Sequence, residues 1–120
     1  MTPTSESDRL MLMHILDCIQ QIWEYTENSR EAFFGSQMVQ DATVRNLQVL
    51  AESTQRLSES IRAIRPDIPW RKIAGFRNIL VHSYLSLDLE AVWSVVEHNL
   101  KDLSEAAEAM LLIVGKDTKP

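Results

Sequence analysis

The stretch RNILVHSY, residues 77 to 84, sets chemically active side chains among apolar ones and marks the end of a helix that starts near Pro69. Arg77 carries a permanent charge on a planar fork of donors that suits a phosphate. His82 is the side-chain type that exchanges a proton near neutral pH. Asn78 can donate and accept hydrogen bonds beside them, and Tyr84 brings a phenol. The stretch therefore combines an anion binder with an acid–base group.

The helix that leads to this stretch is predicted from its prolines and its apolar spacing. Pro66 and Pro69 interrupt the preceding helix, and a proline suits the first turn of the next one. Five steps of 100° put Arg77 and His82 on different sides of an ideal helix, so we expect His82 at or beyond the helix end. Gly75, in the middle, costs about 1 kcal/mol relative to alanine, and we interpret it as letting another backbone approach. The side chains predicted to face inward are Trp70, Ile73, Phe76, Ile79 and Leu80.

The rest of the chain shows apolar residues at spacings of three and four, which indicates helices with one buried face. The pattern predicts helices over about 8–27, 36–64 and 89–114, the last ended by Gly115. A short helical turn over 29–35 would be capped by Ser29 and closed by Gly35. No strand-like alternation occurs. We expect an all-α, up-and-down bundle of four main helices plus this turn, in one domain over 1–120 with flexible tails at 1–7 and 116–120.

Composition narrows the function classes. The formal net charge of −5 and a pI near 5.1 argue against a protein that coats nucleic acid generally. The basic side chains concentrate over residues 62–77, where Asp67 is the only acid, and this predicts a local positive surface beside the motif. Acidic residues dominate 88–108. We read most of these charges, taken singly, as solvated helix faces.

Membrane, secretion and metal chemistry are not indicated. No apolar run approaches the roughly 20 residues of a membrane span, and the first residues do not resemble a signal peptide, so we expect a cytoplasmic protein. His14, His82 and His98 lie far apart and show no metal-ligand spacing. Cys18 is the only cysteine and is expected to be a buried small hydrophobe. We expect neither a metal nor a cofactor.

The spacing Arg-x4-His-x-Tyr resembles that of HEPN domains, and more narrowly that of the HepT toxins of HepT/MntA toxin–antitoxin pairs. The resemblance extends over QDATVRNLQVLAESTQRLS (40–58), DIPWRKIAGFRNILVHSY (67–84) and DLEAVWSVVEHNL (88–100), which is nearly the whole chain. Arg45 and Asn46 recur in similar sequences, and we interpret them first as polar contacts of their helix.

The resemblance implies a metal-independent ribonuclease toxin whose Arg77 and His82 form the catalytic site, with Asn78 in support. It also implies a homodimer with two copies of the motif around one cleft. The partner would be an MntA-like minimal nucleotidyltransferase antitoxin that transfers AMP to Tyr84.

Two alternatives remain open from the residues. Arg77 could form a salt bridge with an acid of the last helix, while His82 could cap the carbonyls of the preceding helix. The chain would then be a non-catalytic module that binds RNA or a nucleotide, or that docks a nucleotidyltransferase. Tyr84 could equally be a core residue.

Overall fold

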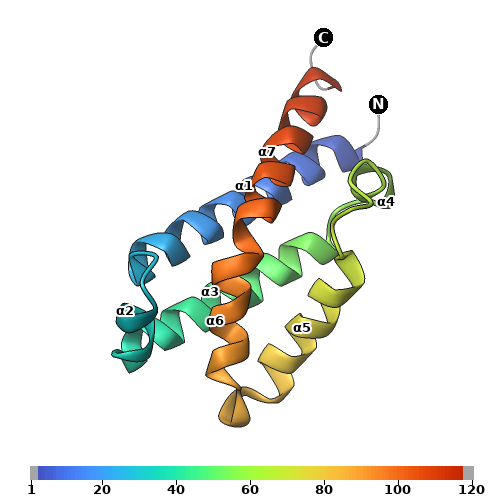
Figure 1. Ribbon diagram of the computed structural model, residues 1–120. Coiled ribbons are helices and arrows are strands. Elements are labelled where there is room, and N and C mark those ends of the chain that lie inside the picture. Colours follow the sequence, from blue (N-terminus) through green and yellow to red (C-terminus); the bar gives the residue numbers. More distant parts are fainter. Residues whose placement is uncertain (1–2, 118–120) are drawn as a thin grey trace.

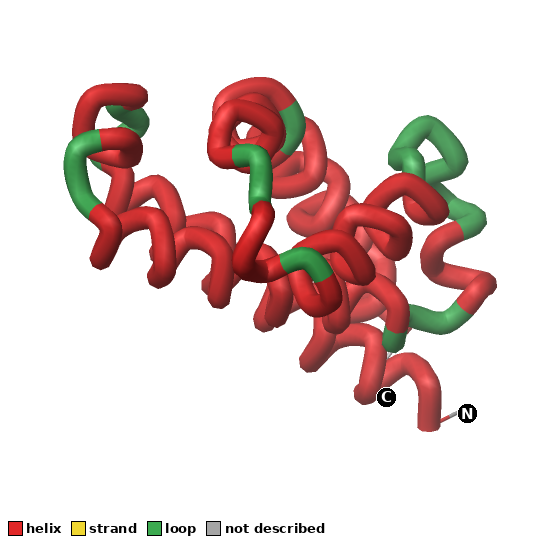
Figure 2. The backbone as a smooth tube through the Cα atoms, turned by 90° about the horizontal axis from the view of Figure 1, so that it is seen from below, coloured by secondary structure: helices red, strands yellow, loops and turns green. Residues whose placement is uncertain are grey.

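The computed structural model describes the backbone of residues 3 to 117 and the side chains of residues 6 to 83 and 85 to 114. Over that part of the chain the backbone forms helices and loops, with no strand (Figure 2). The elements are α1 (Pro3–Thr26), α2 (Arg30–Phe34), α3 (Gln37–Gln55), α4 (Glu59–Arg62), α5 (Trp70–His82), the 3₁₀ turn η1 (Tyr84–Ser86), α6 (Leu89–His98) and α7 (Leu100–Asp117). The predicted all-α bundle is confirmed.

Helix α3 lies at the centre of the arrangement that positions the site. It packs against α1 on one side and α5 on the other, while α7 packs along α1 (Figure 1). The buried stripe of α3 includes Leu47 and Leu50, which meet Ile15 and Ile19 of α1 in one core. The start of α1 and the end of α7 lie at the same end of the molecule.

The short helix α2 forms as predicted. The Ser29 hydroxyl accepts a hydrogen bond from the Ala32 amide, and Gly35 follows the last residue. Phe33 is completely buried and stacks on Trp93 of α6, with ring centroids 5.0 Å from Phe34 and 5.4 Å from Trp93. The α2 segment therefore closes one end of the bundle.

The helix predicted over 36–64 is wrong in its second half, because the chain breaks between α3 and α4. Asp8 of α1 is 5% exposed, and its carboxylate accepts hydrogen bonds from the Ser58 amide (2.8 Å) and the Ser58 hydroxyl (2.6 Å). In a continuous helix that amide would donate to the carbonyl of Thr54. Ser58 instead caps α4 by accepting from the Ile61 amide.

Both ends of the molecule differ from the predicted boundaries. Helix α1 begins at Pro3, so residues 3–7 of the segment predicted as a tail are helical. Pro3 occupies the first helical position, where proline is favoured, and Glu6 places negative charge in the first turn. The helix predicted over 89–114 is divided at Asn99 into α6 and α7, and α7 continues past Gly115 to Asp117. The other tail residues predicted, 1–2 and 118–120, lie outside the described residues.

Gly115 does not end α7 because it does not adopt the left-handed conformation that ends helices at glycine. Asn99 interrupts the last helix because asparagine is a weak helix former whose side chain competes for backbone groups. No helix within the described residues is both long and apolar enough to cross a membrane.

Helix α5 buries a narrower face than its sequence pattern predicts. Leu80 is fully buried, and Trp70, Ile73 and Phe76 pack against the core as expected. Ile79 is 52% exposed, so its predicted inward orientation is wrong. It lies one helical turn after Gly75, and a Cβ at Gly75 would meet nothing within 4 Å. No backbone of this chain, over the described residues, approaches Gly75 closely.

Candidate functional site

The C-terminal end of α5 carries the histidine of the motif. His82 is the last helical residue and its side chain is exposed, which confirms the predicted helix end. The Ser83 amide donates to the Ile79 carbonyl, and Gln48 of α3 donates its side-chain amide to the Leu80 carbonyl at 3.1 Å. The end of α5 is thus held by α3. Among the described residues His82 makes no capping hydrogen bond.

Arg77 is held in place by an acid that the sequence analysis missed. Its Nη2 lies 3.0 Å from Oε1 of Glu52 on α3, and its Nη1 donates to Asn78 Oδ1 at 3.1 Å. Arg77 is half-buried, with 32% of its side chain exposed. The expectation of a partner on the last helix is wrong, because Arg77 faces α3. The other oxygen of Glu52 lies 3.5 Å from Nε of Arg56, so one carboxylate joins two guanidinium groups.

The structure brings some of the predicted site residues together and leaves others apart. Arg77 and Asn78 are hydrogen-bonded, whereas His82 contacts neither of them within the described part of the chain. The backbone of Tyr84 opens η1, directly after the Ser83 cap. The Tyr84 side chain lies outside the described residues. Asn46 donates to the Ala42 carbonyl of its own helix, which confirms its reading as a helix contact.

Arg77 lines a shallow groove of about 340 Å³ between α1, α3 and α5, which we call the arginine groove. Its polar lining consists of His14, Arg45, Gln48, Glu52, Ser53, Arg56 and Arg77. Val81, next to His82, lies at the α5 side. The sequence carries a signal for this face, since Arg45, Glu52 and Arg56 are seven and four residues apart and so share one side of α3. The basic residues near Arg77 therefore come from α3.

Basic residues over 62–77 line two separate cavities, so the positive surface predicted beside the motif includes Arg77 but not Arg65 or Lys72. Arg65 forms two hydrogen bonds with Asp67, at 3.0 and 2.9 Å, and this guanidinium lowers the pKa of the Asp67 carboxyl. Arg65 and Lys72 border a different cavity from Arg77. The basic residues divide because α5 turns its side chains to two sides, with Lys72 and Phe76 on one and Arg77 on the other.

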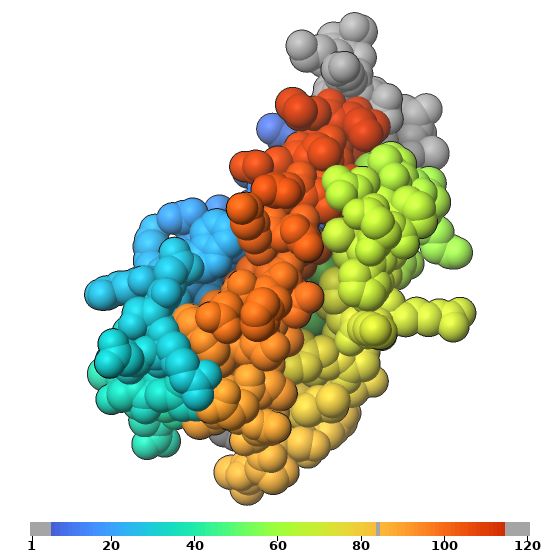
Figure 3. All heavy atoms as spheres, in the orientation of Figure 1, coloured from blue at the N-terminus to red at the C-terminus, as the bar shows by residue number. Residues whose placement is uncertain are grey.

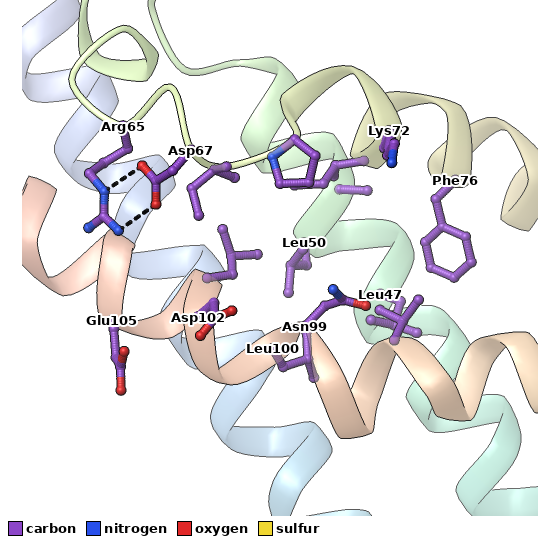
Figure 4. Close-up of a pocket in the computed structure, with 16 residues that line it drawn as sticks. Leu47, Leu50, Arg65, Asp67, Lys72, Phe76, Asn99, Leu100, Asp102 and Glu105 are labelled. Atoms are coloured by element: carbon purple, nitrogen blue, oxygen red, sulfur yellow. Dashed lines mark hydrogen bonds and ion pairs between the residues drawn. The ribbon is translucent and has the colours of Figure 1, made fainter.

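That second cavity has a volume of about 520 Å³ and lies between α3, α5 and α6–α7. It forms a hollow between the orange surface of α6 and α7 and the yellow-green surface of residues 60 to 75 (Figure 3). Leu47, Leu50 and Phe76 give it an apolar interior, and the Arg65–Asp67 pair stands at its edge across from Asp102 (Figure 4). Neither residue of the Arg-x4-His pair lines this cavity, so the larger cavity is separate from the candidate site.

Metal-ligating residues do not gather in the described part of the chain, where no three His, Cys, Asp or Glu side chains are placed to hold an ion. Cys18 is buried, and this burial raises the pKa of its thiol. Trp93 is buried and Trp70 donates to the carbonyls of Arg62 and Arg65, which makes both structural.

Comparison with known proteins adds a family to this geometry. The sequence model of the family described as "Ribonuclease HepT-like" matches residues 15–110. A Methanocaldococcus jannaschii protein named "Putative RNase" is 30% identical over 111 residues, covering 91% of this chain and 92% of that protein. A Thermococcus cleftensis protein named "Probable ribonuclease HepT" is 29% identical over 100 residues, covering 82% and 91%.

A longer relative from Methanocaldococcus jannaschii is named "Gamma-glutamylcyclotransferase and putative RNase". It is 36% identical over 98 residues, which is 81% of this chain, and the chain spans 44% of that protein's length. No solved structure matches.

Proposed function

Because this chain belongs to the ribonuclease HepT-like family, we propose that it is a metal-independent endoribonuclease that cleaves cellular RNA with Arg77 and His82. The observation that supports this most is the state of the two side chains of α5, with Arg77 paired and His82 exposed at the helix end. Arg77 is fixed by Glu52 and Asn78 beside other cations, while the exposed His82 is available to a substrate.

The chemistry assigns one role to each side chain. A neutral His82 removes the proton of a ribose 2′-hydroxyl, and that oxygen attacks the adjacent phosphorus. The bond to the 5′-oxygen breaks, this oxygen takes up a proton, and the products are a 2′,3′-cyclic phosphate and a 5′-hydroxyl. Arg77 neutralises the charge that develops on the phosphate oxygens. Asn78 supports the reaction by holding the Arg77 fork through its side-chain oxygen.

We expect the purified protein to cleave RNA in the presence of a chelator. The proposed steps need a base and a cation, and both are side chains, so no metal is required. The measurement is the cleavage of labelled RNA with EDTA and with added Mg²⁺, together with identification of the cyclic phosphate end. A His82→Ala protein purified in the same way controls for contaminating nucleases. Cleavage that disappears with EDTA would contradict this mechanism, and RNA binding without cleavage would favour a non-catalytic module.

A homodimer would complete the site. One copy of the Arg-x4-His motif holds a single histidine, whereas the reaction uses both a base and an acid. The outward face of α5 carries Gly75, Ile79 and His82, and Leu85 of η1 is 98% exposed beside it. Apolar side chains and an open glycine next to His82 suit contact with a second copy. We propose that two such faces meet at a two-fold axis, so that one His82 acts as base and the other as acid.

Regulation by a partner follows from the family resemblance. We propose that this protein is the cytoplasmic toxin of a toxin–antitoxin pair and that an MntA-like nucleotidyltransferase transfers AMP to Tyr84. The Tyr84 backbone lies two residues past His82, in a turn whose next residue, Leu85, is 98% exposed. Each AMP adds bulk and negative charge beside a site for RNA phosphates, so substrate would be excluded by both size and repulsion.

We expect the protein co-produced with its partner to gain mass in adenylate units, and the gain to disappear in Tyr84→Phe. The chain has two tyrosines, so Tyr25→Phe is the matched control and should be modified like the wild type. Intact mass spectrometry measures all three proteins. Neutralisation of the wild type by binding, with no change in mass, would overturn this assignment.

A further inference from the structure

Three arginines from two helices gather in the arginine groove, although the chain as a whole is acidic. Arg45 projects from α3, Arg56 is the C-terminal cap of that helix, and Arg77 projects from α5. Among the described residues Glu52 is the only acid in the lining. Arg77 and Arg56 both contact that one carboxylate. The three arginines and Glu52 together carry a net charge of +2, with His14 taken as neutral. Such a concentration attracts an anion.

The geometry of the groove suits an extended ligand. Arg45 and Arg56 are eleven residues apart on one face of α3, which corresponds to roughly 16 Å along the helix axis. This spacing suits two phosphates of one strand better than a single phosphate. The groove is shallow. Arg77 lies beside it at Glu52, a residue between Arg45 and Arg56 along the chain.

The described lining contains none of the large aromatic side chains that serve as stacking platforms for bases. None of the described lining residues is Phe, Tyr or Trp, and His14 supplies the one ring among them. Ser53, Val49 and Gln48 are typical of the other uncharged side chains. Single-stranded RNA proteins that read bases combine a basic track with aromatic platforms. A basic track alone contacts the backbone, without reading sequence.

We propose that the arginine groove holds the backbone of a single RNA strand beside the scissile phosphate, with Arg45 and Arg56 as phosphate ligands. This inference rests on the proposed ribonuclease function, because Arg77, the proposed catalytic arginine, also lines the groove. The strand lies along α3, and its path past Val81 leads to His82. Glu52 acts as an internal counter-ion that occupies Arg77 and Arg56 when no RNA is bound. The RNA phosphates compete with this carboxylate for the two guanidinium groups.

Because Glu52 acts as a counter-ion, the proposal predicts changes in RNA affinity of opposite sign for the arginine and glutamate substitutions. Removing Arg45 or Arg56 deletes a phosphate contact and weakens RNA binding. Removing the charge of Glu52 frees two guanidinium groups and deletes the only negative charge in the groove, so binding becomes tighter. A purely structural role would predict weaker binding for all three substitutions, because each would loosen the same surface.

The test measures RNA affinity at several salt concentrations in a His82→Ala background, where the RNA is not consumed. We expect Arg45→Ala and Arg56→Ala each to raise Kd several-fold and to reduce the slope of log K against log salt by about 0.7. Glu52→Gln should lower Kd several-fold. Lys101→Ala is the matched control, because it removes one positive charge from the exposed surface of α7 and should change neither value. Homopolymers of the same length should bind about equally, because the groove contacts the backbone.

The proposal is overturned if the two arginine variants match Lys101→Ala, or if Glu52→Gln weakens binding. Failure of the ribonuclease assignment is a separate result, because it is seen as absence of cleavage by the protein with His82 intact. With that protein, Arg45→Ala and Arg56→Ala should act mainly on KM, so their loss of rate should shrink as the RNA concentration rises.

Discussion

Replacing His82 by alanine is expected to lower the RNA cleavage rate by about 10²–10⁴-fold, because the reaction loses its general base. Arg77→Ala is expected to cost about 10²–10³-fold, since it removes the donor that stabilises charge on the phosphate. Arg77→Lys should remain impaired, because an ammonium cannot hold Asn78 and a phosphate together with a planar fork. Single-turnover cleavage at saturating RNA measures these effects on the chemical step.

His98→Ala is the matched control for the histidine. His98 is exposed on α6, its Nδ1 lies 3.1 Å from the Ser94 carbonyl of its own helix, and it lines neither cavity. Its replacement should leave cleavage unchanged. If His82→Ala cleaves as fast as His98→Ala, the proposed base is wrong.

The same variant tests whether two copies share one site. If each cleft needs both histidines, a mixed dimer of wild type and His82→Ala is inactive. An excess of about tenfold of the variant should then suppress most of the wild-type activity after subunits exchange. Light scattering should report a dimer at the assay concentration. A fully active monomer, or wild-type activity unaffected by the excess, would remove the composite site.

The sequence predicted the helices and the end of α5, because those depend on local patterns. Apolar spacing placed the cores of α1 and α3, and Ser29 with Gly35 defined α2. The position of His82 at the helix end followed from the five helical steps of 100° that separate it from Arg77. Each of these features is encoded within a few residues of where it appears.

The partner of Arg77 could not be found in the same way. Glu52 lies 25 residues earlier, and only the packing of α5 on α3 brings the two side chains together. The basic residues over 62–77 are adjacent in sequence, yet they separate because neighbouring positions on a helix point 100° apart. The position of Ile79 depends on the same packing, since the pattern cannot tell which of Ile79 and Leu80 meets the core.

A tertiary contact also explains why the predicted helix 36–64 breaks. Ser58 has no proline or glycine nearby in sequence to end the helix, and the interruption comes from the buried carboxylate of Asp8, fifty residues away. The same contact anchors the first turns of α1, which the polar sequence of residues 1–7 did not predict. A local reading of either segment therefore misses it.

Asp8→Ala is accordingly expected to lower the free energy of unfolding by about 2–3 kcal/mol, although Asp8 lies far from the proposed site. The substitution removes two charge-assisted hydrogen bonds and leaves the Ser58 amide without its acceptor. Urea unfolding at fixed protein concentration measures the loss, since a dimer would make stability depend on concentration.

Asp17→Ala, on the exposed side of the same helix, is the matched control and should change stability by less than about 0.5 kcal/mol. A cycle with Ser58→Ala should show that the two losses are not additive, because both residues contribute to one pair of bonds. If Asp8→Ala is no less stable than Asp17→Ala, then the contact does not hold the break between α3 and α4, and another cause must be found for it.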